Sequence, residues 1–159
     1  MIPPRSTYQK NHHLHARTTQ STHVGVVPSD ATALLPQQGH REQGHRLVLV
    51  TATIAPMAEA MGKQLGMDTI YGCGPSKRKG ILSGSERGWS VPRRKGKVPV
   101  VERDALENDH DLSLCYGYGN TMADTWFMSI TGNPVAVNPG KKMSELAIKN
   151  EWPIKSWKI

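Results

Sequence analysis

Residues 115–139, CYGYGNTMADTWFMSITGNPVAVNP, decide the fold of this chain. The stretch opens with an apolar run that breaks at Gly119, and Asn120, Thr121 and Asp124 follow within five residues. A buried strand that ends on polar side chains is typical of parallel α/β sheets, which bind ligands at the carboxyl ends of their strands. We therefore expect these polar side chains to lie just past a strand end, where a ligand would bind.

The surrounding sequence alternates between strand and helix patterns, which predicts an α/β fold with a parallel sheet flanked by helices. RLVLVT at 46–51 is a continuous apolar run, the pattern of a strand buried on both faces. A helix is expected over 55–66, with Thr53 as its cap and an inner face made of Met57, Ala60, Met61 and Leu65. In chain order we further expect a short strand at 67–72, a helix at 98–108, a strand at 111–119, a helix at 122–131, a strand at 134–138 and a helix at 140–150.

The composition changes near residue 46, because six of the seven histidines and many Thr, Gln and Pro residues come before it. We expect residues 1–38 to form a divergent, irregular arm with a tendency to disorder, and residues 39–159 to form the core. A chain of 159 residues fits one domain of this kind.

Charge and cysteine content narrow the range of partners. The net charge of +7 attracts anions, which include phosphorylated metabolites, nucleic acid and acidic membrane surfaces. No run approaches the ~18 apolar residues of a membrane span, and we expect no membrane partner. Cys73 and Cys115 form neither a disulfide framework nor a zinc pattern, which favours a reducing, cytoplasmic setting.

Two groups of polar residues could carry chemistry at the strand ends. Thr51 lies between an apolar strand and a helix start, which suits a phosphate or carboxylate; alternatively it fills a turn while Thr53 caps the helix. Asn120 and Asp124 offer oxygen ligands for Mg²⁺; alternatively Asp124 is an acidic residue favoured at the start of a helix.

The basic run at 93–97 supplies a third candidate feature. Lys95 or Lys97 could neutralise a phosphoryl group, and alternatively the run is a solvated loop. Together with the basic loop at 76–79 it could instead bind nucleic acid, although Trp89 is the one aromatic residue between the two runs that could stack on a base.

A strand ending in Thr, then a lysine, then a strand ending in GNTxxD resembles the haloacid-dehalogenase-like (HAD) hydrolase superfamily, and within it the phosphoserine-phosphatase-like branch, subfamily IB. GHRLVLVTATIAPMAEAMGKQLGMDTIYG (44–72) is similar to the family's second motif, and GILSG (80–84) to its G-x-L-T-G turn. KGKVPVV (95–101) resembles the third-motif segment, and residues 116–154 resemble the fourth motif and the tail that contains G-x-P-x-A-V-N-P. The resemblance covers roughly residues 39–155 and implies a Rossmann-like core that lacks the family's cap domain.

The resemblance also implies a chemistry, the Mg²⁺-dependent hydrolysis of phosphomonoesters through an aspartyl-phosphate. In that scheme Thr51 would donate a hydrogen bond to the phosphoryl group and Lys97 would neutralise it. Asn120 stands where the family often has a Mg²⁺-ligating Asp, and Asp124 matches the second acidic position. A neutral Asn should bind the metal less tightly than a carboxylate.

The family's first motif, D-x-D-x-T, does not occur before residue 46. The nearest match is HVGVVPSDAT (23–32), in which Asp30 aligns with the acid/base, Thr32 with the threonine, and Pro28 with the nucleophile. Only 18 residues separate Thr32 from Thr51, where subfamily IB places a whole cap domain. Two interpretations stay open: the match is a coincidence, or this segment fills the centre of a sheet whose neighbouring strands would otherwise lack a partner.

The sequence therefore predicts a HAD-like phosphatase relative that acts on a phosphorylated small molecule and is impaired by the missing nucleophile. The alternative is a non-catalytic protein that binds phosphate, or nucleic acid, through the loops at 76–79 and 93–97. An oligomer that forms through an unpaired sheet edge is a further expectation.

Overall fold

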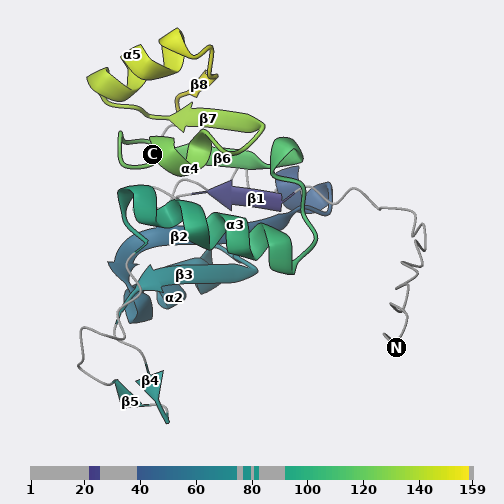
Figure 1. The fold of residues 1–159 in the computed structure, drawn as a ribbon, viewed down its shortest axis with the longest axis vertical. Helices are drawn as coiled ribbons and strands as arrows, with labels where there is room; N and C mark the ends of the chain where they lie inside the picture. The colour runs from purple at the N-terminus through teal and green to yellow at the C-terminus, as the bar shows by residue number, and fades with distance from the viewer. Residues whose placement is uncertain (1–21, 26–38, 75–76, 80, 83–91, 158–159) are drawn as a thin grey trace, which may run out of the picture.

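The structure, a computed structural model, describes residues 22–25, 39–74, 77–79, 81–82 and 92–157 (Figure 1). Its centre is a six-stranded sheet in the order β3-β2-β1-β6-β7-β8, in which all neighbouring strands are parallel. The α/β fold class predicted from the sequence is confirmed. The strands are β1 (Thr22–Gly25), β2 (Arg46–Ile54), β3 (Thr69–Cys73), β6 (Tyr116–Gly119), β7 (Asn133–Val137) and β8 (Ile154–Lys155).

The strand β1 lies between the two strands that the sequence analysis left without a partner. Val24 pairs with Val48 of β2 on one side and with Gly117 of β6 on the other. Residues 22–25 therefore complete the sheet, although they belong to the segment that we expected to form an arm. The rest of that arm lies outside the described residues. An oligomer formed through a sheet edge stays a prediction, and the outer strands of the described sheet are β3 and β8.

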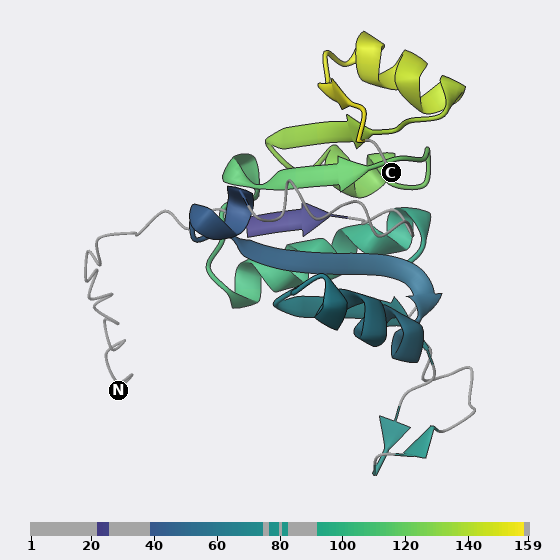
Figure 2. The same ribbon diagram turned by 180° about the vertical axis from the view of Figure 1, so that it is seen from behind.

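Helices cover both faces of the sheet, as the two views in Figures 1 and 2 show. The helices α3 and α4 lie on one face, and α2 lies on the other face near β2 and β3. The helices are α2 (Ala55–Gln64), α3 (Lys97–Glu107), α4 (Thr125–Met128) and α5 (Lys141–Lys149); short 3₁₀ turns are η2 (Arg94–Gly96) and η3 (Leu112–Leu114); a separate hairpin consists of β4 (Lys77–Arg78) and β5 (Ile81–Leu82). Within the described ranges, no helix has the length and apolar character needed to cross a bilayer.

The core forms where α3 and α4 pack on the sheet. Val48 and Val50 of β2 are buried in one cluster with Val101 of α3 and with Phe127 and Met128 of α4. Burial of each such side chain contributes about 1.5–3 kcal/mol relative to leaving it in water. This contact packs both helices against the same strand.

The glycines of β6 allow α4 to approach the sheet closely. A Cβ atom on Gly119 would lie 2.5 Å from the Cβ of Asp124 and from the Sδ of Met128, and one on Gly117 would lie 2.6 Å from Thr131 Oγ1. The pattern YGYG at 116–119 therefore serves two purposes: glycine faces α4 while tyrosine faces the opposite side of the sheet.

A buried carboxylate of α3 forms hydrogen bonds to the strands β2 and β3. Asp104 is fully buried and accepts hydrogen bonds from both terminal nitrogens of Arg46 and, at 2.8 Å, from the hydroxyl of Tyr71. Burial, followed by the hydrogen bond to Asp104, raises the pKa of Tyr71 to about 12. Because each oxygen of Asp104 has a donor, the charge is buried in a satisfied network rather than left alone.

Two expectations about α2 are wrong. The strand β2 continues through Ile54, so Thr53 lies in the strand, and the helix begins without a side-chain cap. The buried residues of α2 are Ala58 and Gly62, whereas Met57 is exposed. The helix packs too closely for large side chains, since a Cβ atom on Gly62 would lie 2.4 Å from Ile70.

The segment after α3 is less regular than its sequence pattern indicates. The strand expected over 111–119 begins only at Tyr116, because a 3₁₀ turn precedes it, with the side chain of Asp111 accepting a hydrogen bond from the backbone N–H of Ser113. The helix expected over 122–131 is reduced to Thr125–Met128. The preceding residues 120–124 form instead a tight loop around a carboxylate, described below.

Candidate functional site

The carboxyl ends of β2 and β6 lie on the same side of the sheet, because both strands are parallel to β1, which lies between them. A cavity of about 510 Å³ lies at these ends. Four of the five predicted site residues line it: Thr51, Lys97, Asn120 and Asp124. The fifth, Asp30, lies outside the described residues. The remaining lining residues are Ala52, Thr53, Arg93, Arg94, Thr121 and Ala123.

Lys97 and Asp124 form a buried ion pair at the cavity. The Nζ atom of Lys97 donates to Oδ1 of Asp124 at 2.7 Å, and the two residues are 4% and 2% exposed. The ammonium group also lies 5.4 Å from the ring centre of Phe127. Lys97 is therefore a fixed part of the cavity wall and not a solvated loop residue. Lys95, the other candidate, is exposed and lies over the ring of Trp126 at 5.7 Å.

The second oxygen of Asp124 closes the loop that follows β6. Oδ2 accepts hydrogen bonds from the backbone N–H of Asn120 at 3.3 Å and of Thr121 at 3.1 Å, and from the Thr121 hydroxyl at 2.9 Å. The spacing N-T-x-x-D allows one carboxylate to bind the loop on one side and Lys97 on the other. Asp124 thus has a positioning role that does not depend on the dipole of the very short helix α4.

Thr51 and Thr53 form a small hydrogen-bonded pair on the other wall of the cavity. The Thr51 hydroxyl donates to Thr53 Oγ1 at 3.0 Å and accepts from the Thr53 backbone N–H at 3.1 Å. This turn holds the Thr51 side chain at the cavity while leaving its oxygen a further lone pair. In this geometry Thr51 fills a turn, and binding an anion would require its single hydroxyl proton to turn from Thr53 Oγ1 toward the ligand.

Arg93 and Arg94 also line the cavity, although the sequence analysis placed them in a basic loop without a specific role. The charge of Arg93 also affects the pKa of Cys73, whose thiol lies 3.9 Å from the Thr51 carbonyl oxygen. Burial raises the pKa of the Cys73 thiol, and the charges of Arg93 and Lys97 oppose that shift in part. The thiol is consequently protonated at neutral pH and is a poor nucleophile. The available signal for the arginines was their position just before Lys97.

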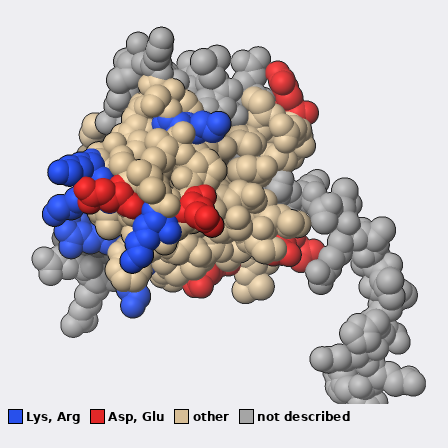
Figure 3. All heavy atoms as spheres, turned by 90° about the horizontal axis from the view of Figure 1, so that it is seen from above, with Lys and Arg blue, Asp and Glu red and all other residues tan. Residues whose placement is uncertain are grey.

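Positive charge gathers on this side of the molecule. Figure 3 shows Lys and Arg side chains concentrated toward the side to which the strands of Figure 1 point. The lining of the cavity contains three cationic residues and one carboxylate, and that carboxylate is already paired with Lys97. The site is therefore suited to an anionic ligand.

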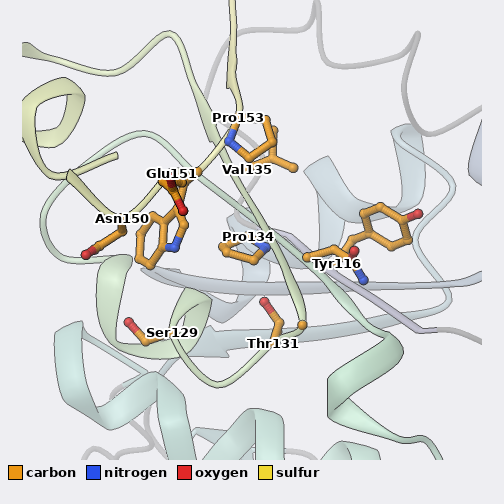
Figure 4. A pocket seen from close by; sticks show the side chains of 11 residues that line it. Tyr116, Ser129, Thr131, Pro134, Val135, Asn150, Glu151 and Pro153 are labelled. Carbon is orange, nitrogen blue, oxygen red and sulfur yellow. The ribbon is translucent and has the colours of Figure 1, made fainter. Parts of the chain in front are cut away.

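A second hollow, of about 740 Å³, lies at the amino-terminal ends of the strands, where β6 and β7 begin (Figure 4). Tyr116 and Pro134 line it together with Glu151, Trp152 and Pro153. Its described lining contains no lysine or arginine and none of the predicted site residues. Size alone would favour this hollow, but the chemistry favours the smaller cavity.

The described residues do not by themselves fit a Mg²⁺ ion. Mg²⁺ requires near-octahedral oxygen coordination, in which carboxylates and substrate phosphates usually take part. Both oxygens of Asp124 already bind donors, which leaves the neutral side chain of Asn120 as the remaining candidate ligand of the predicted pair. No group of three His, Cys, Asp or Glu residues in the described ranges could hold a metal.

The fold and the cavity define a class: parallel α/β proteins with a cavity that basic residues line at the carboxyl ends of the strands. A family model for haloacid dehalogenase-like hydrolases matches residues 6–129 of the chain, which therefore belongs to this family. The family inferred from the motifs is confirmed.

The curated proteins similar to this chain include one named a phosphoserine phosphatase. This chain is 28% identical over 130 residues to phosphoserine phosphatase SerB1 of Mycobacterium tuberculosis. The matched segment covers 82% of this chain and 42% of that protein. It is 25% identical over 130 residues to the inhibition of morphological differentiation protein of Streptomyces azureus. That match covers 81% of this chain and 46% of the relative. The chain thus spans less than half the length of these curated relatives.

Solved structures show the same fold. A Bordetella pertussis protein of unknown function superposes with a TM-score of 0.70 at 24% identity, covering 79% of this chain and 57% of that one. A substrate-bound phosphoserine phosphatase superposes with a TM-score of 0.58 at 17% identity, covering 71% of this chain and 53% of that one.

Proposed function

We propose that this chain binds phosphomonoesters in the cavity at the carboxyl edge of the sheet and hydrolyses them poorly or not at all. The observation that carries the proposal is the buried Lys97–Asp124 pair facing Thr51 across a cationic cavity. An ammonium group has three donors, and Asp124 uses one of them. The other two are available to phosphoryl oxygens, and the Thr51 hydroxyl donates a further hydrogen bond from the opposite wall once it turns away from Thr53 Oγ1.

Impaired hydrolysis follows from the carboxylates that the chain offers. The family's chemistry needs an aspartate nucleophile, and Pro28 stands at the aligned position in the sequence. Asp124 is the carboxylate among the lining residues, and its oxygens are held by Lys97 and by the loop at 120–124. It cannot attack a phosphoryl group without breaking the pair that holds Lys97. Asp30, aligned with the family's acid/base, completes the proposed set of site residues.

The role of Mg²⁺ in the proposal is correspondingly weak. The family uses this ion to offset charge on the phosphoryl oxygens. With Asn120 as a neutral ligand and Asp124 bound to Lys97, we expect Mg²⁺ to bind only at millimolar concentrations or above and to change phosphate binding little. Calorimetric titration of Mg²⁺ with and without inorganic phosphate tests this, and tight binding would contradict it.

The experiment that tests the proposed function has a binding arm and a turnover arm. Inorganic phosphate is titrated into the chain by calorimetry, and release of 4-nitrophenol from its phosphate ester is followed with Mg²⁺ and with a chelator. We expect phosphate to bind, Thr51→Val to weaken it, and turnover to stay near background. Turnover that disappears in Asp124→Ala would reveal a working nucleophile and overturn the impaired state. A folded chain that does not bind phosphate would overturn the binding site.

Nucleic-acid binding through the loops at 76–79 and 93–97 is the second candidate. One observation favours it: Trp126 is 49% exposed beside Lys95, so it could stack on a base. Fluorescence anisotropy with a labelled single-stranded oligonucleotide, repeated over a range of salt concentrations, separates the two candidates. Submicromolar binding with a steep salt dependence would favour nucleic acid, and its absence would leave the small phosphorylated ligand.

A cytoplasmic location is part of the same proposal. It is supported by Cys73 and Cys115, the two cysteines of the sequence, which are both buried and form no disulfide. Cytosolic proteins keep such thiols reduced. Cell fractionation that recovers the chain outside the cytoplasm would contradict it.

A further inference from the structure

The two arginines of the cavity hold charge that the phosphate site does not use. Lys97 has Asp124 as its partner, whereas Arg93 and Arg94 form no ion pair with any residue that the structure describes. No other carboxylate lines the cavity within those ranges. The described lining of the site therefore carries two positive charges beyond the buried pair.

The cations lie at different depths. Lys97 is 4% exposed and belongs to the inner wall, while Arg93 and Arg94 are exposed and lie toward the solvent. A phosphoryl group bound between Lys97 and Thr51 would leave the arginines facing the rest of the ligand. The volume of about 510 Å³ is within the range of small-molecule sites, roughly 300–1,000 Å³, and has room for more than one anionic group.

The backbone supports this placement. Arg94 has a φ of 47°, a left-handed conformation that non-glycine residues rarely adopt. It starts the turn η2, which packs against α4 and leads directly into Lys97 at the start of α3. The strained turn thus brings two guanidinium groups and one ammonium group to the same cavity within five residues.

Guanidinium groups suit one kind of ligand particularly well. Their planar set of N–H donors matches the geometry of carboxylate and phosphate oxygens and can bind them in a bidentate way. We propose that the ligand of this cavity is a phosphorylated compound with a second anionic group, a carboxylate or a second phosphate, which binds Arg93 and Arg94. This inference rests on the proposed function, because it assumes that the first phosphate binds at Lys97.

The test uses phosphonates, since they cannot be hydrolysed and report on binding alone. Calorimetry compares propylphosphonate, which has one anionic group, with 3-phosphonopropionate and with propylene bisphosphonate, which carry a carboxylate or a second phosphonate at the other end. We expect one of the doubly anionic ligands to bind at least about tenfold more tightly than propylphosphonate. The ligand with the larger advantage identifies the second group as carboxylate or phosphate.

Variants separate a specific contact from general attraction. The double variant Arg93→Gln/Arg94→Gln should reduce the tenfold advantage to about threefold or less while propylphosphonate still binds. Lys95→Gln, which removes a charge from the same run but not from the cavity lining, should keep the advantage. Equal affinity for all three ligands, or an advantage that survives in the double variant, would overturn the inference. Failure of propylphosphonate and inorganic phosphate to bind would instead overturn the proposed function and, with it, this inference.

Discussion

Replacing Lys97 by methionine should destabilise the fold strongly, because it leaves the Asp124 carboxylate buried without its cation. Breaking one partner of a buried ion pair typically costs about 3–5 kcal/mol. We expect the lower end, about 3 kcal/mol, because Asp124 Oδ2 keeps its three hydrogen bonds from the loop at 120–124. With a urea m-value of about 2 kcal/mol per M, the unfolding midpoint should fall by about 1.5 M.

A double-mutant cycle shows whether that loss comes from the pair itself. Asp124→Asn removes the opposite charge but keeps an oxygen that can accept from the loop, and we expect it to cost about 2 kcal/mol. The combined variant Lys97→Met/Asp124→Asn should cost about 3 kcal/mol rather than the sum of about 5, a coupling of about 2 kcal/mol. The matched control is Lys95→Met, which loses an exposed cation–π contact worth about 0.5–1 kcal/mol.

Urea unfolding followed by circular dichroism measures all four variants. If Lys97→Met costs no more than Lys95→Met, the lysine is solvated and the cavity wall is not formed as described. If the two single effects simply add in the double variant, the two side chains do not interact in solution. Either outcome would remove the fixed cation on which the proposed phosphate site depends.

Three further predictions concern the loop at 120–124 and two positions elsewhere in the fold. Gly119→Ala should lower both stability and phosphate affinity, since its Cβ would lie 2.5 Å from the Cβ of Asp124 in the loop at 120–124. Gly140→Ala is the control, because Gly140 has open space around it, and it should change neither quantity. Thermal melting measures the stability and calorimetry the affinity. Asp104→Asn should cost about 3 kcal/mol in urea unfolding because it leaves Arg46 without its buried counter-charge, and a loss within error of zero would contradict the buried network. Burial, with repulsion from a neighbouring histidine second, lowers the pKa of His40 from 6.5 to about 4, so the unfolded chain binds more protons and stability should fall as the pH drops from 6.5 toward 4. His40→Gln should flatten that part of the pH–stability curve, and an unchanged slope would show that the histidine is not buried in its neutral form.

The meeting of Thr51, Lys97, Asn120 and Asp124 could be predicted because it depends on chain order and strand direction. Each residue follows or precedes a recognisable strand or helix, and parallel strands end at the same edge. The basic run alone does not choose between Lys95 and Lys97, which are two residues apart, whereas the family resemblance assigned Lys97 to the site. The start of α3 at Lys97 and its packing against α4 decide the matter, and both are tertiary effects.

Other failures share the same cause, that packing outweighs local pattern. The sequence THVG of β1 has little apolar content of its own, yet it becomes a strand because β2 and β6 supply hydrogen-bonding partners on both sides. The inner face of α2 was assigned from its largest apolar residues, but the close approach to Ile70 selects Gly62. Arg93 and Arg94 carry no periodic signal, and only the turn η2 brings them to the cavity.

The geometry separates the part of the site that is proposed to bind an anion from the part that would cleave the ligand. Asp124 holds Lys97 and the loop at 120–124 at once, and these contacts connect β6, α3 and α4 inside the core. The wall formed by Lys97 and Asp124 is therefore expected to be needed for folding whether or not a nucleophile is present. A substitution that abolishes phosphate binding by removing Lys97 must also destabilise the fold, whereas one that removes Arg93 or Arg94 should change ligand preference at unchanged stability. Measuring stability and binding on the same variants distinguishes a cavity preserved by folding alone from one that also selects a ligand.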